Sequence, residues 1–193
     1  MVITNEDAVK SLAEVEDVMA KTRQSLVSAY AGPFLILWGF LWFVSYVGTH
    51  FYPDWTPWIW NISNIIGIAD TAIIGKRLYG QGPARRNIDK KFLLRTILFW
   101  PLVFLFAVVW LNILKPNSGI ELNAFIVTVV MFAYVVMGLW FDSWLMSILG
   151  VVITAFALVG VHLVPAEYYC LYMAVMAGGG LLSTGLYMKL RWR

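Results

Sequence analysis

Asp70 is the residue whose type and position most suggest chemistry. It lies within a long apolar run, 58–75, five residues before Gly75. A carboxylate inside a bilayer is costly and often marks a proton relay or a cation site. It could equally be a structural acid near the inner membrane surface, satisfied by water, by Thr71 or by a basic side chain of the next loop. The sequence leaves both interpretations open.

A polar stripe runs through the same segment. Asn61, Asn64, Gly67 and Asp70 recur every three residues, which places them on a helix face that drifts from one end to the other. Because lipid cannot satisfy carboxamides, we expect this stripe to face other helices. It either lines a hydrated transport path, for which Asp70, Asn61, Asn64 and Thr71 are the candidates, or supplies interhelical hydrogen bonds.

The chain has two histidines, His50 and His162, and each is followed within five residues by an acid, Asp54 or Glu167. Two imidazoles and two carboxylates could hold a divalent metal or supply the axial ligands of a haem. They could also respond to external pH. Since no ligand spacing supports a metal, we favour interfacial histidines without a ligand and predict no cofactor.

Small residues at helical spacing mark faces where helices can approach closely. The predicted helix-packing residues are Gly150, Thr154, Ala174, Gly178 and Gly185.

Motifs of known enzymes are not found in the sequence. There is no Gly-x-Ser-x-Gly, no His-Glu-x-x-His and no glycine-rich phosphate loop. Cys170 is the single cysteine, so an internal disulfide is impossible. We therefore expect a protein that is not an enzyme.

The elements that position these residues follow from composition. Of 193 residues, 61% are hydrophobic and 13% charged, against about 25% charged in soluble domains. The apolar residues gather into runs of about 20, the length that a bilayer requires of a spanning helix. We predict an all-α, polytopic membrane protein with six transmembrane helices arranged as three hairpins. The predicted spans are 29–50, 58–75, 92–114, 120–141, 144–163 and 168–188.

Basic residues fix the predicted orientation. With a cytoplasmic N-terminus, 13 of the 14 Lys and Arg residues fall on the inner side and only Lys115 falls outside. We therefore expect a multi-pass protein of the plasma (inner) membrane with both termini cytoplasmic. The net charge of +3 reflects this topology, so we expect no nucleic-acid partner.

Residues 1–27 form a separate predicted unit ahead of the transmembrane domain, 28–193. Apolar residues recur there at three- and four-residue steps, with five acidic residues in between. This pattern predicts a cytoplasmic amphipathic helix, and its acidic face favours packing on protein over anionic lipid. The apolar positions are Val9, Leu12, Val15, Val18, Met19, Thr22 and Leu26.

The pattern V-G-x-H-x-x-P occurs at 47–53 and again at 159–165, so the first two helices could be a diverged copy of the last two. The segment 150–192 resembles the repeat of HdeD-like bacterial membrane proteins. Leu37-Trp38-Gly39 and Gly178-Gly179-Gly180-Leu181 also resemble segments of uncharacterised bacterial six-helix proteins. The resemblance implies repeated hairpins with a proline in the outer turn and, for the first family, an association with acid stress.

Three functions compete. The leading one is a non-enzymatic accessory, sensory or assembly subunit that acts through protein partners or a homo-oligomer within the lipid bilayer. The alternative is a small proton- or cation-coupled transporter or channel that uses the polar stripe. A third is a haem- or metal-binding electron-transfer subunit.

Overall fold

The computed structural model describes residues 5–80 and 90–191, and all regular structure in these residues is helical. Arg85, Arg86 and the rest of the loop 81–89 lie outside the described residues. The elements are α1 (Asn5–Phe51), η1 (Pro53–Trp55), α2 (Thr56–Gly80), α3 (Lys90–Leu114), α4 (Gly119–Trp140), α5 (Trp144–Leu163), α6 (Tyr169–Met173), the π-helical η3 (Ala174–Gly179) and α7 (Gly180–Arg191).

Five stretches of helix within the described residues are long and apolar enough to cross a membrane. They are Ala31–Phe51, Leu94–Leu114, Gly119–Trp140, Trp144–Leu163 and Tyr169–Arg191. The sixth predicted span, on α2, is not among them. Asn61, Asn64 and Asp70 lower the apolar character of this helix, which is otherwise rich in isoleucine. The fold is therefore that of an all-α, multi-pass membrane protein with five candidate spans.

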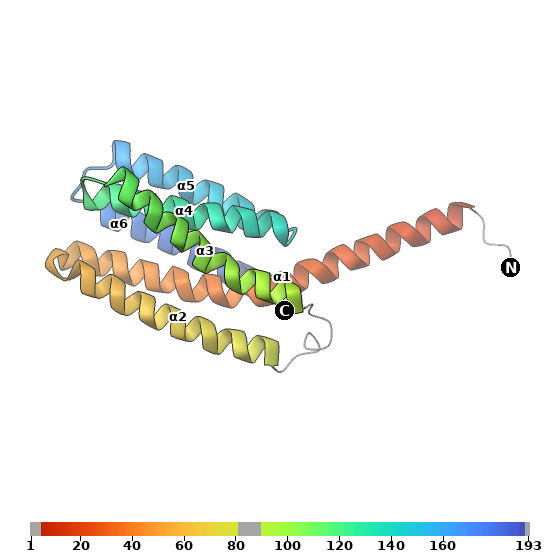
Figure 1. Ribbon diagram of the computed structural model, residues 1–193. Helices are drawn as coiled ribbons and strands as arrows, with labels where there is room; N and C mark the ends of the chain where they lie inside the picture. The colour runs from red at the N-terminus through yellow and green to blue at the C-terminus, as the bar shows by residue number, and fades with distance from the viewer. Residues whose placement is uncertain (1–4, 81–89, 192–193) are drawn as a thin grey trace.

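The turns at Pro53, Pro116 and Pro165 lie at one end of the bundle, here named the proline end, at the left of Figure 1. α1 packs against α2 and against α6, η3 and α7, while α4 packs against α5. These contacts of α1 with the last helix and of α4 with α5 are the most extensive, so the closest packing is between helices of different predicted hairpins.

The predicted amphipathic helix and first span form one continuous helix of 47 residues, without a break near residue 27. Its N-terminal part projects beyond the bundle (Figure 1). Leu12, Val15 and Val18 are exposed on this arm. Of the other predicted apolar positions on the arm, the side chains of residues 9, 19, 22 and 26 lie outside the described residues.

Glycines bring α1 and the last helix into backbone contact. A Cβ at Gly39 would collide with the backbone of Leu182, and one at Gly178 would lie 2.6 Å from the Phe43 nitrogen. A Cβ at Gly185 would lie 2.8 Å from the Ile36 nitrogen. These helices run antiparallel at a separation that only glycine permits, because real Cβ atoms do not approach other heavy atoms so closely.

The α4–α5 pair is held in the same way. A Cβ at Gly138 would collide with Ser147, and one at Gly150 would lie 2.6 Å from the Met131 carbonyl oxygen. A tight turn between Phe141 and Ser143 separates the two helices, as the predicted spans 120–141 and 144–163 require, and Asp142 adopts the left-handed region at φ 57°. Aspartate adopts this region more readily than most residues.

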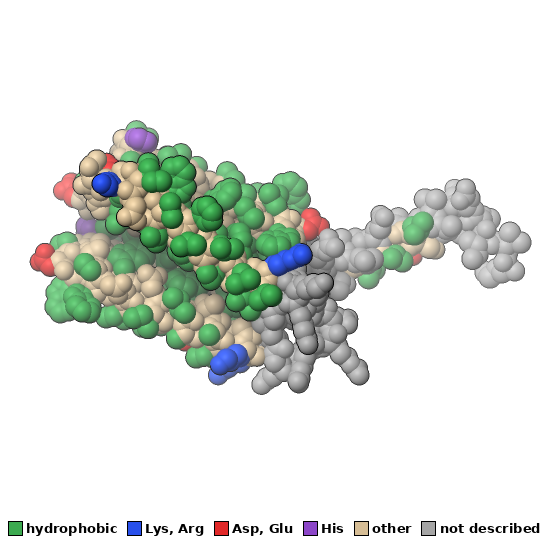
Figure 2. Space-filling view, viewed as in Figure 1, with side chains coloured by type: hydrophobic (Ala, Val, Ile, Leu, Met, Phe, Trp, Pro, Cys, Tyr) green, Lys and Arg blue, Asp and Glu red, His purple; other side chains and the backbone are tan. Residues whose placement is uncertain are grey.

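α3 is the least packed helix of the described chain. Only 6% of its apolar stretch is buried inside the protein, against 33–39% for the other four candidate spans. Figure 2 shows the surface hollowed between α2 and the pair α3 and α4, with hydrophobic side chains over most of the bundle and charged ones mainly at its two ends. The α2 and α3 flank is therefore open.

Candidate functional site

Hydrogen bonds between α1 and α2 form a polar seam along the bundle. Trp38 Nε1 donates to Thr71 Oγ1 at 3.1 Å, and Ser45 Oγ donates to Ser63 Oγ at 2.7 Å. Nearer the proline end, Trp60 Nε1 donates to Thr49 Oγ1 at 3.2 Å. Thr71, one of the predicted path residues, is thus part of the contact between two helices.

The predicted polar stripe only partly faces the bundle. Gly67 is buried, and a Cβ there would lie 2.7 Å from the Trp38 ring. Asn61 and Asn64 are exposed, contrary to our expectation. The stripe drifts around α2, so the face that contacts α1 passes through Gly67 and leaves both asparagines to one side.

Asp70 is half-buried and lies on the flank of α2 next to Thr71. It lines neither the small cavity at the turn between α4 and α5 nor the cavity between α3 and α4. Transport through Asp70 stays a prediction.

A second polar cluster joins three helices near the proline end. The hydroxyls of Tyr46 on α1 and Tyr169 on α6 both donate to the Asn123 side-chain oxygen on α4, at 3.0 and 2.9 Å. Tyr46 and Tyr169 are 1% and 2% exposed. Trp60 of α2 stacks edge-on against Tyr46, with ring centroids 5.0 Å apart. One carboxamide oxygen therefore ties α1, α4 and α6 together.

Sequence reasoning missed this cluster. Asn123 is an amide inside an apolar run, and a polar residue at that place in a membrane helix indicates an interhelical hydrogen bond. The tyrosines gave no comparable indication, because tyrosine near a helix end is equally typical of an interfacial anchor.

The histidines and their neighbouring acids lie at or beyond the last turn of α1 and α5, at the proline end. His50 is half-buried and its ring contacts Phe51 edge-on at 5.0 Å, whereas His162, Asp54 and Glu167 are exposed. Within residues 5–80 and 90–191, no group of three or more His, Cys, Asp or Glu side chains is placed to hold a metal ion. The metal and haem hypotheses gain no support from this geometry.

The V-G-x-H-x-x-P copies nevertheless share a structural feature. A Cβ at Gly48 would lie 3.3 Å from Ile59, and one at Gly160 would lie 3.1 Å from Tyr169 and Tyr172. In each copy, the glycine lies against the helix that follows the proline turn.

Three of the five predicted packing residues, Gly150, Gly178 and Gly185, lie against another helix. Ala174 and Gly178 are buried in η3, and Gly185 is buried in α7 against α1. Gly150 lies against α4, and the Thr154 hydroxyl donates to the Gly150 carbonyl within α5 at 2.8 Å.

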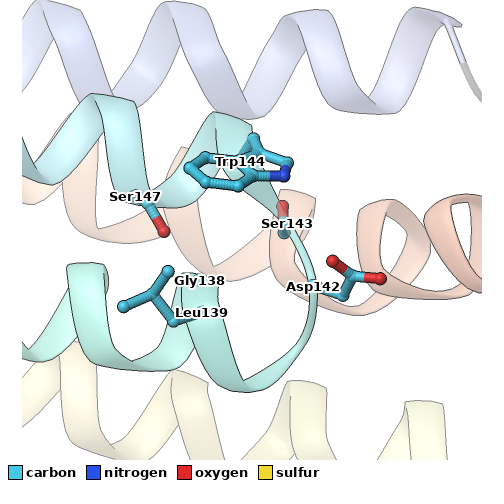
Figure 3. A pocket seen from close by; sticks show the side chains of 6 residues that line it. All are labelled: Gly138, Leu139, Asp142, Ser143, Trp144 and Ser147. Atoms are coloured by element: carbon cyan, nitrogen blue, oxygen red, sulfur yellow. The ribbon is translucent and has the colours of Figure 1, made fainter.

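Two small cavities lie near the ends of α4. One of about 40 Å³ lies between α4 and α5 at their turn, where Figure 3 shows Ser147 and Trp144 on one side and Leu139 on the other. Its size suits water rather than a substrate. The other, about 190 Å³, lies between α3 and α4 at the proline end and includes Glu121. That carboxylate accepts from the Asn117 backbone nitrogen at 2.8 Å and so helps to cap α4.

Comparisons with protein-family models, curated proteins and solved structures find no match for this chain. The resemblance to HdeD-like proteins therefore stays a prediction.

Proposed function

We propose that this chain is a non-enzymatic accessory, sensory or assembly subunit of the bacterial inner membrane that acts by binding other membrane proteins or itself. The observation that carries the proposal is the open flank of α2 and α3. α2 contacts the bundle mainly through its α1 side, and α3 packs only lightly on α4, so the outward sides of both helices are left uncovered.

The exposed arm of α1 supports the same proposal. Leu12, Val15 and Val18 are 64%, 54% and 61% exposed on a helix that leaves the bundle. Apolar side chains repeated along one side of a projecting helix are typical of a surface that binds another helix or a groove. In this proposal α2 completes six spans, and the arm lies in the cytoplasm with both termini.

The proposal is tested by isolating the full-length, tagged chain from native membranes in a mild detergent. We expect a second protein or a second copy in stoichiometric amount. Leu12→Lys together with Val15→Lys should reduce recovery of a partner that docks on the arm. The control Glu14→Ala, which changes an exposed polar side chain of the same arm and leaves its apolar residues intact, should not. Isolation of a lone monomer that none of these variants affects would contradict the proposed function.

A further inference from the structure

α2 and α3 expose different chemistry on the open flank. α3 exposes mainly leucine, phenylalanine and valine, which lipid tails can cover. Its Asn112 is exposed too, but the side-chain nitrogen donates to the Val108 carbonyl of the same helix at 2.8 Å. On α2, Asn61 and Asn64 are exposed, and neither carboxamide has a hydrogen-bond partner among the described residues. Lipid tails can therefore cover α3, but they cannot supply hydrogen bonds to the Asn61 and Asn64 carboxamides of α2.

The depth of Asn64 in the membrane decides how costly its unpaired carboxamide is. It lies eight residues after Thr56, the first residue of α2. At a rise of 1.5 Å per residue this is about 12 Å along the helix axis. If α2 spans the bilayer, the Asn64 carboxamide lies well inside the hydrocarbon, where every polar group needs a protein partner.

The neighbours of these asparagines have the spacing of a helix-pairing surface. Positions 58, 61, 65, 68 and 72 are separated alternately by three and four residues, and all five are exposed. They lie on the opposite side of α2 from Ser63, Gly67 and Thr71, which contact α1. Alternating steps of three and four are those of a two-helix coiled coil. The asparagine face is defined as these five positions, Trp58, Asn61, Ile65, Ile68 and Ala72, together with Asn64 at its edge.

A second copy of the chain, related by a twofold axis, can supply hydrogen-bond partners for the carboxamides of this face. A carboxamide carries both a donor and an acceptor, so two asparagines can bond to each other. The membrane fixes the same direction for both copies, and a twofold axis along its normal places Asn61 opposite Asn61 at equal depth. Asn64 lies at the edge of the same contact, where its carboxamide can reach polar groups of the second copy. Asparagine within an apolar heptad also fixes register.

We propose that two copies of this chain associate through their asparagine faces, with the two α2 helices side by side and parallel. The inference rests on the proposed function and deepens it by naming the partner at α2. It leaves the arm of α1 free for a different protein.

Disulfide cross-linking in native membrane vesicles tests the geometry. With Cys170→Ser as background, a single cysteine is introduced at Ile65 or Ile68 on the asparagine face. The matched controls are Ile66→Cys and Ile73→Cys, which are also exposed but lie on another side of α2. We expect covalent dimers from the first pair under mild oxidation and at least severalfold less from the controls. Equal cross-linking of both pairs, or none of either, would overturn the inference.

Asparagine substitutions test the chemistry. Asn61→Leu combined with Asn64→Leu should weaken dimerisation of the detergent-solubilised full chain about tenfold or more, because several interhelical hydrogen bonds are lost. The control Asn112→Leu, whose carboxamide bonds within its own helix, should leave dimerisation unchanged. Should the double variant not fold, the cross-linking pair still decides the question. A monomeric wild type, or a different membrane protein in place of the second copy, would overturn the dimer, and the second result would still support the proposed function.

Discussion

The contact between α1 and α7 and the outward face of α2 differ in the chemistry that they offer for helix association. At the first, Gly39 and Gly185 bring two backbones into contact. At the second, Asn61 and Asn64 stand exposed, with no partner among the described residues. Between helices in lipid the hydrophobic effect contributes little, so close packing or hydrogen bonding must hold them. Close packing holds α1 against α7, whereas the outward face of α2 carries hydrogen-bonding groups that are not used within the described residues.

The largest effect is expected from breaking the glycine contact. Gly39→Ala should destabilise the protein by roughly 1–3 kcal/mol, because the added Cβ meets the Leu182 backbone and the two helices must separate. The midpoint of thermal unfolding in detergent measures this. Gly119→Ala is the control, since nothing lies within 4 Å of its Cβ position. Equal stability of the two variants would show that the α1–α7 approach is not as close as described.

A smaller effect is expected at the shared amide. Asn123→Leu removes the acceptor of two buried tyrosine hydroxyls and should cost about 1–2 kcal/mol of unfolding free energy. Tyr169→Phe should cost less, since Tyr46 still donates to Asn123. Denaturant titration in detergent with Asn112→Leu as the exposed control checks both. A neutral Asn123→Leu would mean that hydrogen bonds contribute little to this core, unlike its glycine contacts.

The smallest effect is expected on the α1–α2 seam. Ser45→Ala and Ser63→Ala each remove one partner of a single hydrogen bond, for which about 0.6 kcal/mol is typical in membrane proteins. A double-mutant cycle on unfolding free energy isolates the pair. A coupling near zero would leave Gly67 packing on Trp38 as the main link between the helices. It would also sharpen the contrast with the asparagine face.

Much of the fold could be predicted from the sequence. The α5 bounds agree with the predicted span, and the turn at Asp142 lies where two helices had to be divided. Bilayer thickness sets these lengths, so composition suffices. The continuity of α1 through residue 27 could not be predicted, because polar and apolar helical segments join without any change of backbone geometry.

The candidate sites were less predictable. Thr71 and Gly67 do meet another helix, as a polar stripe in lipid requires, whereas Asn61 and Asn64 do not. A stripe at every third residue rotates around the helix, so the sequence cannot say which part of it meets α1. The two tyrosines that bond to Asn123 could not be predicted for another reason. They lie 77 and 46 residues from Asn123 in the sequence, so no local pattern links them.

The sequence by itself determined that this protein is helical and membrane-bound, because long apolar runs have few other stable states and their polar interruptions mark the ends. Only the tertiary structure decided that α1 packs against the last helix and that α2 turns its asparagines outward. Both depend on how helix faces meet across the bundle, which the spacing of residues along one helix does not fix.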